Sequence, residues 1–364
     1  MRLVADALED LSQGAVFLAT GGGGDPYVSF LLAREMLEAT DGVELMDPED
    51  LDDDAFVVTL GGVGAPTVSL ELLPSQEEPA ETLLAFEAHV GRKADALVSF
   101  EIGGGNSLVP LIAAAELGIP VIDGDGMGRA LPEAQMMTYP ISGVKPCPAV
   151  ARNYAGHLAA FDTDSIFEYE KQIRRFALEH GGMVLAAEHP MTGAELKASV
   201  VPNTVTFSVE IGRILREHRG NAEAMAAHLA EAFGPSIYGS FHHLYSGKVI
   251  DYSSRIIGGY DIGEATLESF DKRLENMHID IKNEYLVARI GDRVVTSVPD
   301  LISILDYETS TPINAERLRY GQRVSVFGIG CPEYYRRPEA LAVVAPKCFG
   351  FDFEYRPLEE IAPS

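Results

Sequence analysis

The sequence of 364 residues predicts an α/β domain over residues 1–164, with a largely parallel sheet, and a mostly-β domain over residues 165–364. Three observations support this. In the first part, short apolar runs alternate with amphipathic stretches, as in a sheet covered by helices. Next, the patterns at residues 165–180 and 192–233 predict helices only. Beyond Gly239, short alternating segments with turn signals between them indicate a sandwich or small barrel that carries the helical stretch as an insertion.

Four apolar runs in the first domain are each predicted to form a strand that ends in a glycine-dense turn. The runs are residues 16–19, 56–60, 96–100 and 120–122, and glycines follow them at 21–24, 61–64, 103–105 and 124–128. The patterns between the runs predict helices at 27–39, at 80–90 and from 107 to 117. Because ligands of open α/β sheets bind outside the carboxyl ends of the strands, these turns are the expected place for a site.

The second domain begins with helices predicted at 165–180 and 192–233, the latter broken by Pro202. Turn signals then separate a series of short β-like segments. These predicted strands are residues 246–252, 255–260, 278–282, 285–290, 293–298, 322–329 and 340–345.

The charge and the cysteines of the chain exclude several classes of partner. With 28 Lys+Arg against 55 Asp+Glu, the formal net charge is -27, which repels nucleic acid and anionic membranes. The apolar stretches are shorter than the ~20 residues of a membrane helix, and the acidic start is unlike a signal peptide. Cys147, Cys331 and Cys348 form no CxxC pair, as expected for reduced thiols. We expect a cytoplasmic homo-oligomer that binds neither nucleic acid nor membrane.

The first candidate site is the segment from Thr20 through Gly22 and Gly23 to Asp25, before the helix predicted at 27–39. Backbone N–H groups at a helix N-terminus form an anion site, but the segment matches neither GxGxxG nor GxxxxGK[ST]. Asp25 also fits a helix N-cap that precedes a proline. A phosphate cradle, a structural turn and the wall of a small polar substrate site therefore all remain open.

The second candidate combines Glu101 and Asn106, which flank three glycines after a predicted strand. Glycines let the backbone approach a ligand closely, and Asn106 is also a plausible helix cap. One interpretation is a capped helix behind a flexible turn. The other places the Glu101 carboxylate and the Asn106 amide in a cleft shared with the first segment.

The third and densest candidate contains Asp123, Asp125, Arg129 and Glu133 within one glycine-rich turn. In an extended chain Asp123 and Asp125 lie on the same side, and close carboxylates raise each other's pKa, which suits acid–base catalysis. The same pair is able to hold a divalent cation, although the spacing excludes an EF-hand. A structural turn with an Arg–Glu surface pair is the remaining interpretation.

Other reactive side chains give weaker signals. His242 and His243 are adjacent, so on a strand they face opposite ways, and the nine histidines include no HExxH motif. His189 precedes a predicted helix entry and is interpreted as an ordinary histidine. Cys147 lacks an obvious catalytic partner, and no GxSxG motif is present.

Taken together, these motifs resemble the S-methyl thiohydantoin desulfurase family, which is associated with hydantoinase/oxoprolinase genes. The resemblance rests on the segments 20–27, 101–106 and 123–133 and continues in order through 190–193, 282–288, 298–302, 319–324 and 349–352. It therefore covers nearly the whole chain. His242 with His243, the segment 330–335 and Cys348 depart from the family pattern, so the ring on which this member acts remains open.

The resemblance implies hydrolysis of a thiohydantoin-like or hydantoin-like five-membered ring without a bound cofactor. No metal ligands are predicted, and a bound divalent metal remains an alternative. Water adds to the C=N carbon that bears sulfur, and methanethiol leaves. As a hypothesis, Asp123 or Asp125 is the base, Arg129 is the orienting cation, and Glu133 completes the catalytic group. The substrate-binding group is then Thr20, Gly22, Gly23, Asp25, Glu101 and Asn106. Two other functions remain as alternatives: an accessory protein of a hydantoinase/oxoprolinase system, and a metal- or nucleotide-dependent enzyme.

Overall fold

The computed structural model describes residues 1–362, apart from the side chains of Ser69 and Leu70. A mixed sheet forms the centre of its first domain. Its strands are β1 Arg2–Leu3, β2 Val43–Met46, β3 Phe56–Gly64, β4 Ala96–Ser99, β5 Val121–Asp125, β6 Ala149–Asn153, β7 Leu158–Phe161, β8 Met183–Thr192 and β9 Val201–Pro202. They lie in the order β1-β2-β5-β4-β3-β8-β6-β7, with β9 beside β5. The four central strands β2, β5, β4 and β3 are parallel, which confirms the predicted class, while the strands around them pair antiparallel.

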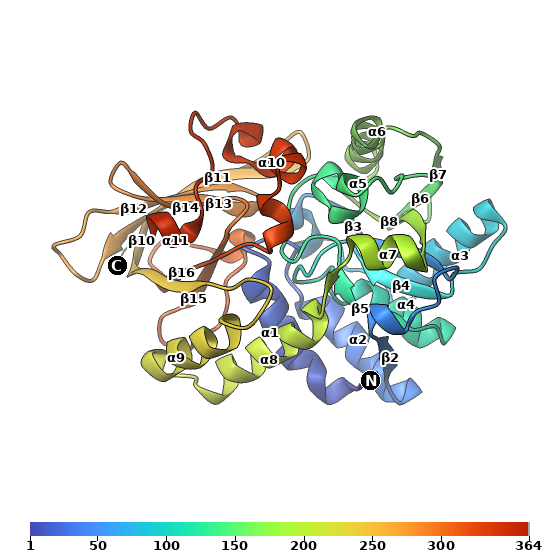
Figure 1. Cartoon of the computed structure of the whole chain (residues 1–364), viewed down its shortest axis with the longest axis horizontal. Helices are drawn as coiled ribbons and strands as arrows, with labels where there is room; N and C mark the ends of the chain where they lie inside the picture. Colours follow the sequence, from blue (N-terminus) through green and yellow to red (C-terminus); the bar gives the residue numbers. More distant parts are fainter. Residues whose placement is uncertain (363–364) are drawn as a thin grey trace.

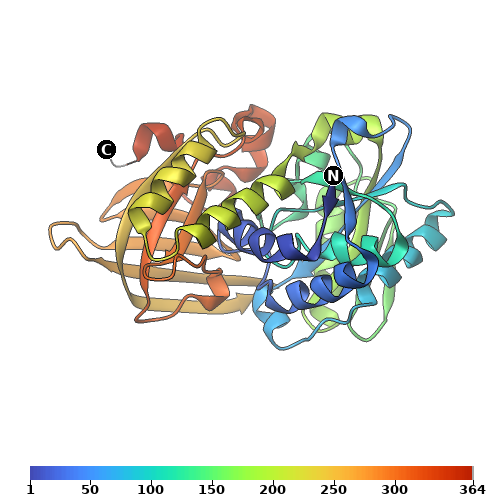
Figure 2. The same cartoon turned by 90° about the horizontal axis from the view of Figure 1, so that it is seen from below.

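Helices cover this sheet and continue below both domains (Figures 1 and 2). They are α1 Leu8–Leu18, α2 Tyr27–Thr40, α3 Glu78–Val90, α4 Val109–Leu117, α5 Thr138–Ile141, α6 Ile166–Glu179, α7 Gly193–Ser199, α8 Thr204–Glu217 and α9 Ala222–Phe233. The helices predicted at 27–39, 80–90 and 107–117 are confirmed, as is the one at 165–180. The long helical stretch predicted from 192 to 233 is divided into α7, α8 and α9, with the short strand β9 at Pro202.

The strand predicted at 16–19 is wrong, because these residues belong to the last turn of α1 and the residue after it. Leu8, Leu11, Ala15 and Leu18 are all buried at the three- and four-residue spacing of a helix face. The helix packs closely on α8, since a Cβ atom added at Gly14 would lie 1.8 Å from the Ser208 carbonyl oxygen. The apolar run is therefore the buried side of a helix.

The turn predicted at 61–64 is also wrong, because β3 continues through these glycines. Gly61 and Gly62 pair with Ala186 and Leu185 of β8. An added Cβ at Gly61 would lie 2.5 Å from the Phe100 ring, so this glycine makes room for a neighbouring aromatic side chain rather than for a turn. Strands β6, β7 and β8 have no counterpart in the sequence prediction.

The second sheet is antiparallel throughout and lies beside the first (Figure 1). Its strands are β10 Phe241–Ile257, β11 Tyr260–Ser269, β12 Met277–Lys282, β13 Glu284–Ile290, β14 Arg293–Ser297, β15 Leu301–Asp306 and β16 Arg323–Ile329. They lie in the order β14-β13-β12-β11-β10-β16-β15. The edge strands β14 and β15 contact each other, so the sheet curls toward a barrel, one of the two predicted architectures.

Several strand predictions for this domain need correction. The segments 246–252 and 255–260 belong mainly to one long strand, β10, and β11 and β15 were not predicted. The segment 340–345 is not a strand but lies largely in helix α10 Pro338–Val344. Pro338 opens this helix, where its missing N–H is tolerated, and Ala340 and Val344 are buried one turn apart. A last short helix, α11, spans Leu358–Ile361.

The two domains meet at the segment that follows α1. The backbone N–H of Tyr285 donates to the Thr20 carbonyl oxygen at 2.7 Å, and that of Ala315 donates to the Gly21 carbonyl oxygen at 2.8 Å. Both donors belong to the second domain. The first glycine segment is thus fixed from both sides, and this contact positions the site described below.

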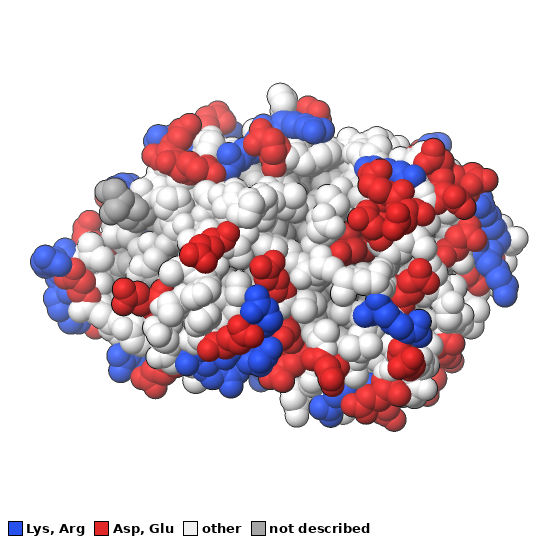
Figure 3. Space-filling view, turned by 60° about the horizontal axis from the view of Figure 1, so that its bottom comes forward, with Lys and Arg blue, Asp and Glu red and all other residues white. Residues whose placement is uncertain are grey.

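The acidic surplus lies on the surface. Figure 3 shows acidic side chains across both halves of the face it presents, with smaller groups of basic side chains between them. Within residues 1–362, no helix is long and apolar enough to cross a membrane.

Candidate functional site

A cavity of about 70 Å³ lies where the glycine segments of the first domain meet the second domain. Since a buried water needs roughly 10–15 Å³ by this measure, the cavity has room for a small ring. Its lining includes five carboxylate side chains: Glu101, Glu133, Glu170, Glu188 and Glu284. Glu101 and Glu133 lie within residues 1–164, whereas Glu170 on α6, Glu188 on β8 of the first sheet and Glu284 on β13 of the second sheet lie further along the chain.

The glycine segments 20–24 and 101–106 interlock at the wall of this cavity. The N–H of Gly105 donates to the carbonyl oxygens of Gly23 and Gly24 at 2.9 and 3.0 Å. An added Cβ at Gly23 would lie 2.4 Å from the Gly103 Cα, and the φ of Gly23 is +72°. Glycine is therefore required at Gly23 both by the backbone conformation and by the close approach of the two segments.

Glu101 lies at the end of β4 and is buried within this wall. Its Oε1 accepts a hydrogen bond from Asn106 Nδ2 at 2.8 Å, and the Asn106 Oδ1 in turn accepts from the Gly62 N–H at 2.7 Å. Burial raises the pKa of Glu101 to about 7, with a smaller contribution from the charge of Asp125. Near neutral pH this carboxyl group exists in both protonation states, as an acid–base catalyst requires.

Glu284 faces the same cavity from the second domain. Its side chain is buried, and burial followed by the charge of Glu101 raises its pKa well above the usual range. An added Cβ at Gly22 would lie 2.3 Å from Glu284 Oε1, so the glycine makes room for this carboxyl group. Glu284 Oε2 has no hydrogen-bond partner among the described residues. Burial and the charge of Glu101 thus both favour the protonated form of Glu284.

Arg129 lies behind this pair and is completely buried. Its guanidinium donates to the carbonyl oxygens of Ala130, Pro299 and Asp300 at 2.6 to 2.9 Å and to Thr20 Oγ1 at 2.9 Å. Burial lowers the pKa of Arg129, while the charge of Glu284 opposes that shift. Arg129 therefore joins the two domains and places positive charge near Glu101 and Glu284.

Asp125 supports the backbone of the glycine segments. Its Oδ2 accepts from the N–H groups of Ile102, Met127 and Gly128 at 2.8, 2.9 and 2.8 Å. Burial raises its pKa to about 7. Asp125 is not among the described residues that line the cavity.

Asp123 supports the start of α8 instead. It accepts from the N–H groups of Val205 and Thr206 at 3.1 Å each, and from the Thr206 hydroxyl at 2.7 Å. These bonds hold the carboxylate at the helix N-terminus, where negative charge is favourable. Like Asp125, Asp123 is not among the described lining residues.

Asp25 acts at the entry to α2 and between the domains. Its Oδ1 accepts from the Tyr27 N–H at 2.9 Å, so the capping contact predicted from sequence exists, although Pro26 occupies the position directly before the helix. Its Oδ2 accepts from Arg317 at 2.6 Å. Residues 20–27 contain no Lys or Arg, and the basic partner of Asp25 comes from the second domain.

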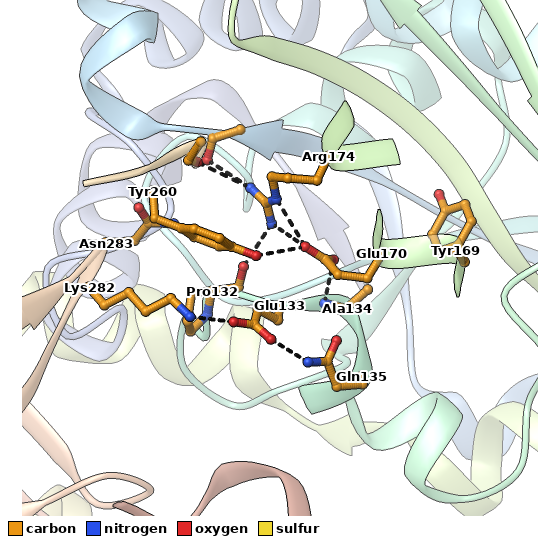
Figure 4. Close-up of polar contacts among 12 residues, drawn as sticks. Pro132, Glu133, Ala134, Gln135, Tyr169, Glu170, Arg174, Tyr260, Lys282 and Asn283 are labelled. Carbon is orange, nitrogen blue, oxygen red and sulfur yellow. Dashed lines mark hydrogen bonds and ion pairs between the residues drawn. The ribbon is translucent and has the colours of Figure 1, made fainter. Parts of the chain in front are cut away.

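Part of the cavity lining belongs to a cluster of opposite charges (Figure 4). Glu170 Oε1 accepts from Arg174 at 2.8 and 2.9 Å and from the Tyr260 hydroxyl at 3.0 Å, and the Arg174 guanidinium lies 4.3 Å from the centre of the Tyr260 ring. Glu133 pairs with Lys282 of the second domain. Each charge here already has a partner, so this cluster serves to hold the two domains together around the cavity.

A buried polar group lies at another wall of the cavity. Glu188 accepts from the Tyr169 hydroxyl, and its Oε1 lies 3.0 Å from Nδ1 of the completely buried His189. His189 has a left-handed backbone with φ of 46°, a conformation that is costly for a residue with a side chain. Glu188 lines the cavity, and His189 is the next residue in the chain.

The remaining reactive candidates lie apart from this group. Burial raises the pKa of the Cys147 thiol to about 11, so the thiolate is scarce near neutral pH. His243 Nε2 lies 2.8 Å from Ser246 Oγ, and burial lowers the pKa of His243. Neither Cys147 nor His242 nor His243 is among the described lining residues.

The structure thus brings together Gly23, Glu101, Asn106 and Glu133 from the sequence-predicted set at the cavity, with Thr20, Gly22 and Arg129 directly behind it. Sequence reasoning missed Glu284, Glu188 and the Glu170–Arg174 pair. Glu284 lies within the family-like segment 282–288, which is the signal that could have identified it. The four-residue spacing of Glu170 and Arg174 is typical of a surface ion pair, so nothing in the sequence distinguished it.

Among the described residues, no group of three or more His, Cys, Asp or Glu side chains is arranged to hold a metal ion. Two family models match the chain in succession: the S-Me-THD-like N-terminal domain over residues 6–163 and the S-Me-THD-like C-terminal domain over residues 163–358. No curated protein matches the chain. The fold is similar to the crystal structure of a structural-genomics protein from Chromobacterium violaceum, with a TM-score of 0.82 and 24% identity over 98% of this chain and 100% of that one. The two models together span nearly the whole chain in order, and the protein therefore belongs to the S-Me-THD-like family.

Proposed function

We propose that this protein is a cofactor-independent hydrolase that acts on a thiohydantoin-like or hydantoin-like five-membered ring, as an S-methyl thiohydantoin desulfurase does. The observation that carries the proposal is that two buried glutamates from the sides of the two sheets line one cavity: Glu101, with a pKa raised to about 7, and Glu284, with a pKa raised well above its usual range. Two carboxyl groups whose surroundings separate their pKa values are the usual basis for one base and one acid in a single site.

The assignment follows from the contacts of the two groups. Glu101 is the base, because its carboxylate is held by the Asn106 amide and is partly ionised near neutral pH. Glu284 is the acid, because it retains its proton. Asp123 and Asp125, which the sequence favoured as the base, are occupied by backbone N–H donors. In this proposal they position the glycine segments and helix α8.

The reaction then proceeds by addition and elimination. Glu101 takes a proton from water while the water oxygen bonds to the ring carbon that bears sulfur, and Glu284 gives its proton to the adjacent ring nitrogen. The C–S bond breaks, and Glu101 returns its proton to the leaving methanethiolate. The new hydroxyl group loses its proton to Glu284 as the carbonyl forms. The products are a hydantoin and methanethiol, and both glutamates end in their starting protonation states.

The acidity of the cavity supports a neutral substrate. Five glutamates line it, and a phosphate or nucleotide in this place would meet carboxylates rather than free lysines. The S-Me-THD-like family membership is consistent with ring chemistry of this kind. The expected cytoplasmic location and homo-oligomeric state remain predictions.

The test is turnover of S-methyl thiohydantoin by the purified chain, with methanethiol release and ring opening followed separately. We expect methanethiol without ring opening. Glu101→Gln and Glu284→Gln should each lower kcat by roughly 10²–10⁴-fold, whereas Glu77→Gln, at an exposed position outside the cavity, serves as the matched control and should leave it unchanged. Absence of turnover by the wild-type chain on thiohydantoin and hydantoin rings alike would refute the proposal.

A further inference from the structure

A second cavity adjoins the first. It has a volume of about 100 Å³, and we call it the side chamber. The residues that line both cavities are Gly23, Gly24, Gly62, Asn106 and Met183. The shared wall is thus made of glycine backbone, the amide that holds Glu101, and one flexible methionine, whose Cε lies 2.9 Å from the Cβ position of Gly62. A group attached to a ring in the first cavity would have to pass this thin wall to reach the side chamber.

The side chamber is mostly apolar. Its walls come from α2, from α4, from strand β8 and from the segment before α3. The apolar side chains among its described lining residues are Leu32, Leu72, Leu73, Pro74, Pro79, Val109, Ile112, Val184 and Leu185. Polar and charged residues, among them Asp25, Ser29, Glu78 and Arg152, complete the lining. A predominantly apolar wall with some polar groups is typical of a site that binds the hydrocarbon part of a ligand.

The charges around both cavities do not suit an anionic arm. Among the described lining residues, the cations are Arg174 in the first cavity and Arg152 in the side chamber. Arg174 is bonded to Glu170. Arg152 lies 2.5 Å from Glu81 and 3.7 Å from Glu78. A carboxylate brought into the side chamber would lose its water without gaining an unpaired cation, which is costly.

Resting on the proposed function, we propose that the side chamber is a specificity site for an uncharged, apolar arm on the ring. The substrate class is then a five-membered S-methyl thiohydantoin-type ring whose ring carbon carries a hydrocarbon arm small enough for a cavity of about 100 Å³. An arm that ends in a carboxylate, such as a propionate, is disfavoured. In this proposal the ring occupies the first cavity and the arm occupies the side chamber beyond the shared wall at Gly62 and Met183.

The primary test is binding, which does not depend on turnover. Isothermal titration compares 5-isobutylhydantoin with hydantoin-5-propionate and with unsubstituted hydantoin on the wild-type chain. We expect the isobutyl compound to bind at least about tenfold more tightly than the propionate, from burial of its methyl and methylene groups and the desolvation cost of the carboxylate. Equal or tighter binding of the propionate, or no binding of either compound, would overturn the proposal.

Two chamber-filling variants locate the arm. Leu185→Trp on β8 and Leu32→Trp on α2 enlarge half-buried side chains that line the side chamber from different elements. Each variant should weaken binding of the isobutyl compound by about tenfold and change binding of hydantoin itself by less than about twofold. If both folded variants affected the two compounds equally, the arm would lie elsewhere. Because the two positions belong to different elements, misfolding of one variant leaves the other to decide.

A charge variant gives the opposite prediction. Glu78→Gln removes one partner of Arg152 and should raise propionate binding by about threefold or more, while Glu77→Gln on the neighbouring exposed residue should not. Turnover of the same rings is measured in parallel. Loss of turnover with the binding preference intact contradicts the proposed function alone, and turnover without arm preference contradicts the side-chamber assignment alone.

Discussion

Replacing Asp125 by alanine should unfold the protein more readily, because this carboxylate satisfies three buried backbone donors. The N–H groups of Ile102, Met127 and Gly128 lie 2.8 to 2.9 Å from its Oδ2. Each unpaired buried donor costs about 1–3 kcal/mol. Part of that cost is offset, because the carboxyl group is itself unfavourably buried, as its pKa of about 7 indicates. We therefore expect Asp125→Ala to lower the free energy of unfolding by about 2–4 kcal/mol.

The matched variant is Asp125→Asn, which keeps an oxygen facing the same three donors and removes the charge. The free energy of unfolding of this variant should remain within about 1 kcal/mol of the wild-type value. The assay is urea unfolding at pH 7, with the midpoints and slopes compared among the three proteins. The reasoning fails if the alanine variant is within about 0.5 kcal/mol of the wild type, the usual range for surface changes. It also fails if the asparagine variant is as unstable as the alanine variant.

Two further predictions concern stability. Because burial raises the folded-state pKa values of Glu101 and Asp125 to about 7, from 4.5 and 3.8, the folded state binds more protons than the unfolded state over this window. The contribution of these two groups to the free energy of unfolding should therefore fall as the pH rises from about 4 to about 7. Glu101→Gln should flatten this fall, measured by urea unfolding, and an unchanged or steeper fall would contradict the cause. Gly212→Ala should destabilise the folded protein by about 1–3 kcal/mol, because the new Cβ would lie 1.8 Å from the Asp10 carbonyl oxygen. The control Gly234→Ala, whose Cβ would lie 3.4 Å from its nearest atom, should cost less than about 1 kcal/mol. Equal thermal unfolding curves for the two variants would refute this prediction.

Much of the first domain was predictable from its pattern, and its errors have physical causes. Strand β4 and helix α4 follow directly from apolar runs between turns. Helix α1 was misread because its buried residues include Val16, Phe17 and Leu18 in succession, which hides the helical period. The glycines at 61–64 suggested a turn, yet Gly61 is a glycine because the Phe100 ring occupies the place of its side chain. Such a tertiary contact leaves no local signal.

The site was predictable in part. Glu101 and Asn106 were found because carboxyl ends of parallel strands collect ligand-binding groups. Asp123 or Asp125 was expected as the base because Asp–Gly segments look alike whether the carboxylate faces a ligand or accepts backbone N–H groups. Glu284 comes from the other domain, and its place beside Gly22 depends on how the two domains dock, which periodicity and spacing do not encode.

The central claim is that Glu101 and Glu284 together catalyse hydrolysis of a hydantoin-like ring. The most direct measurement is methanethiol release from S-methyl thiohydantoin by the wild type and by Glu101→Gln, with the thermal unfolding of both recorded. The account predicts release by the wild type and a loss of at least about 10²-fold in the variant at an unchanged or higher unfolding temperature. A folded Glu101→Gln variant that releases methanethiol at the wild-type rate would contradict it.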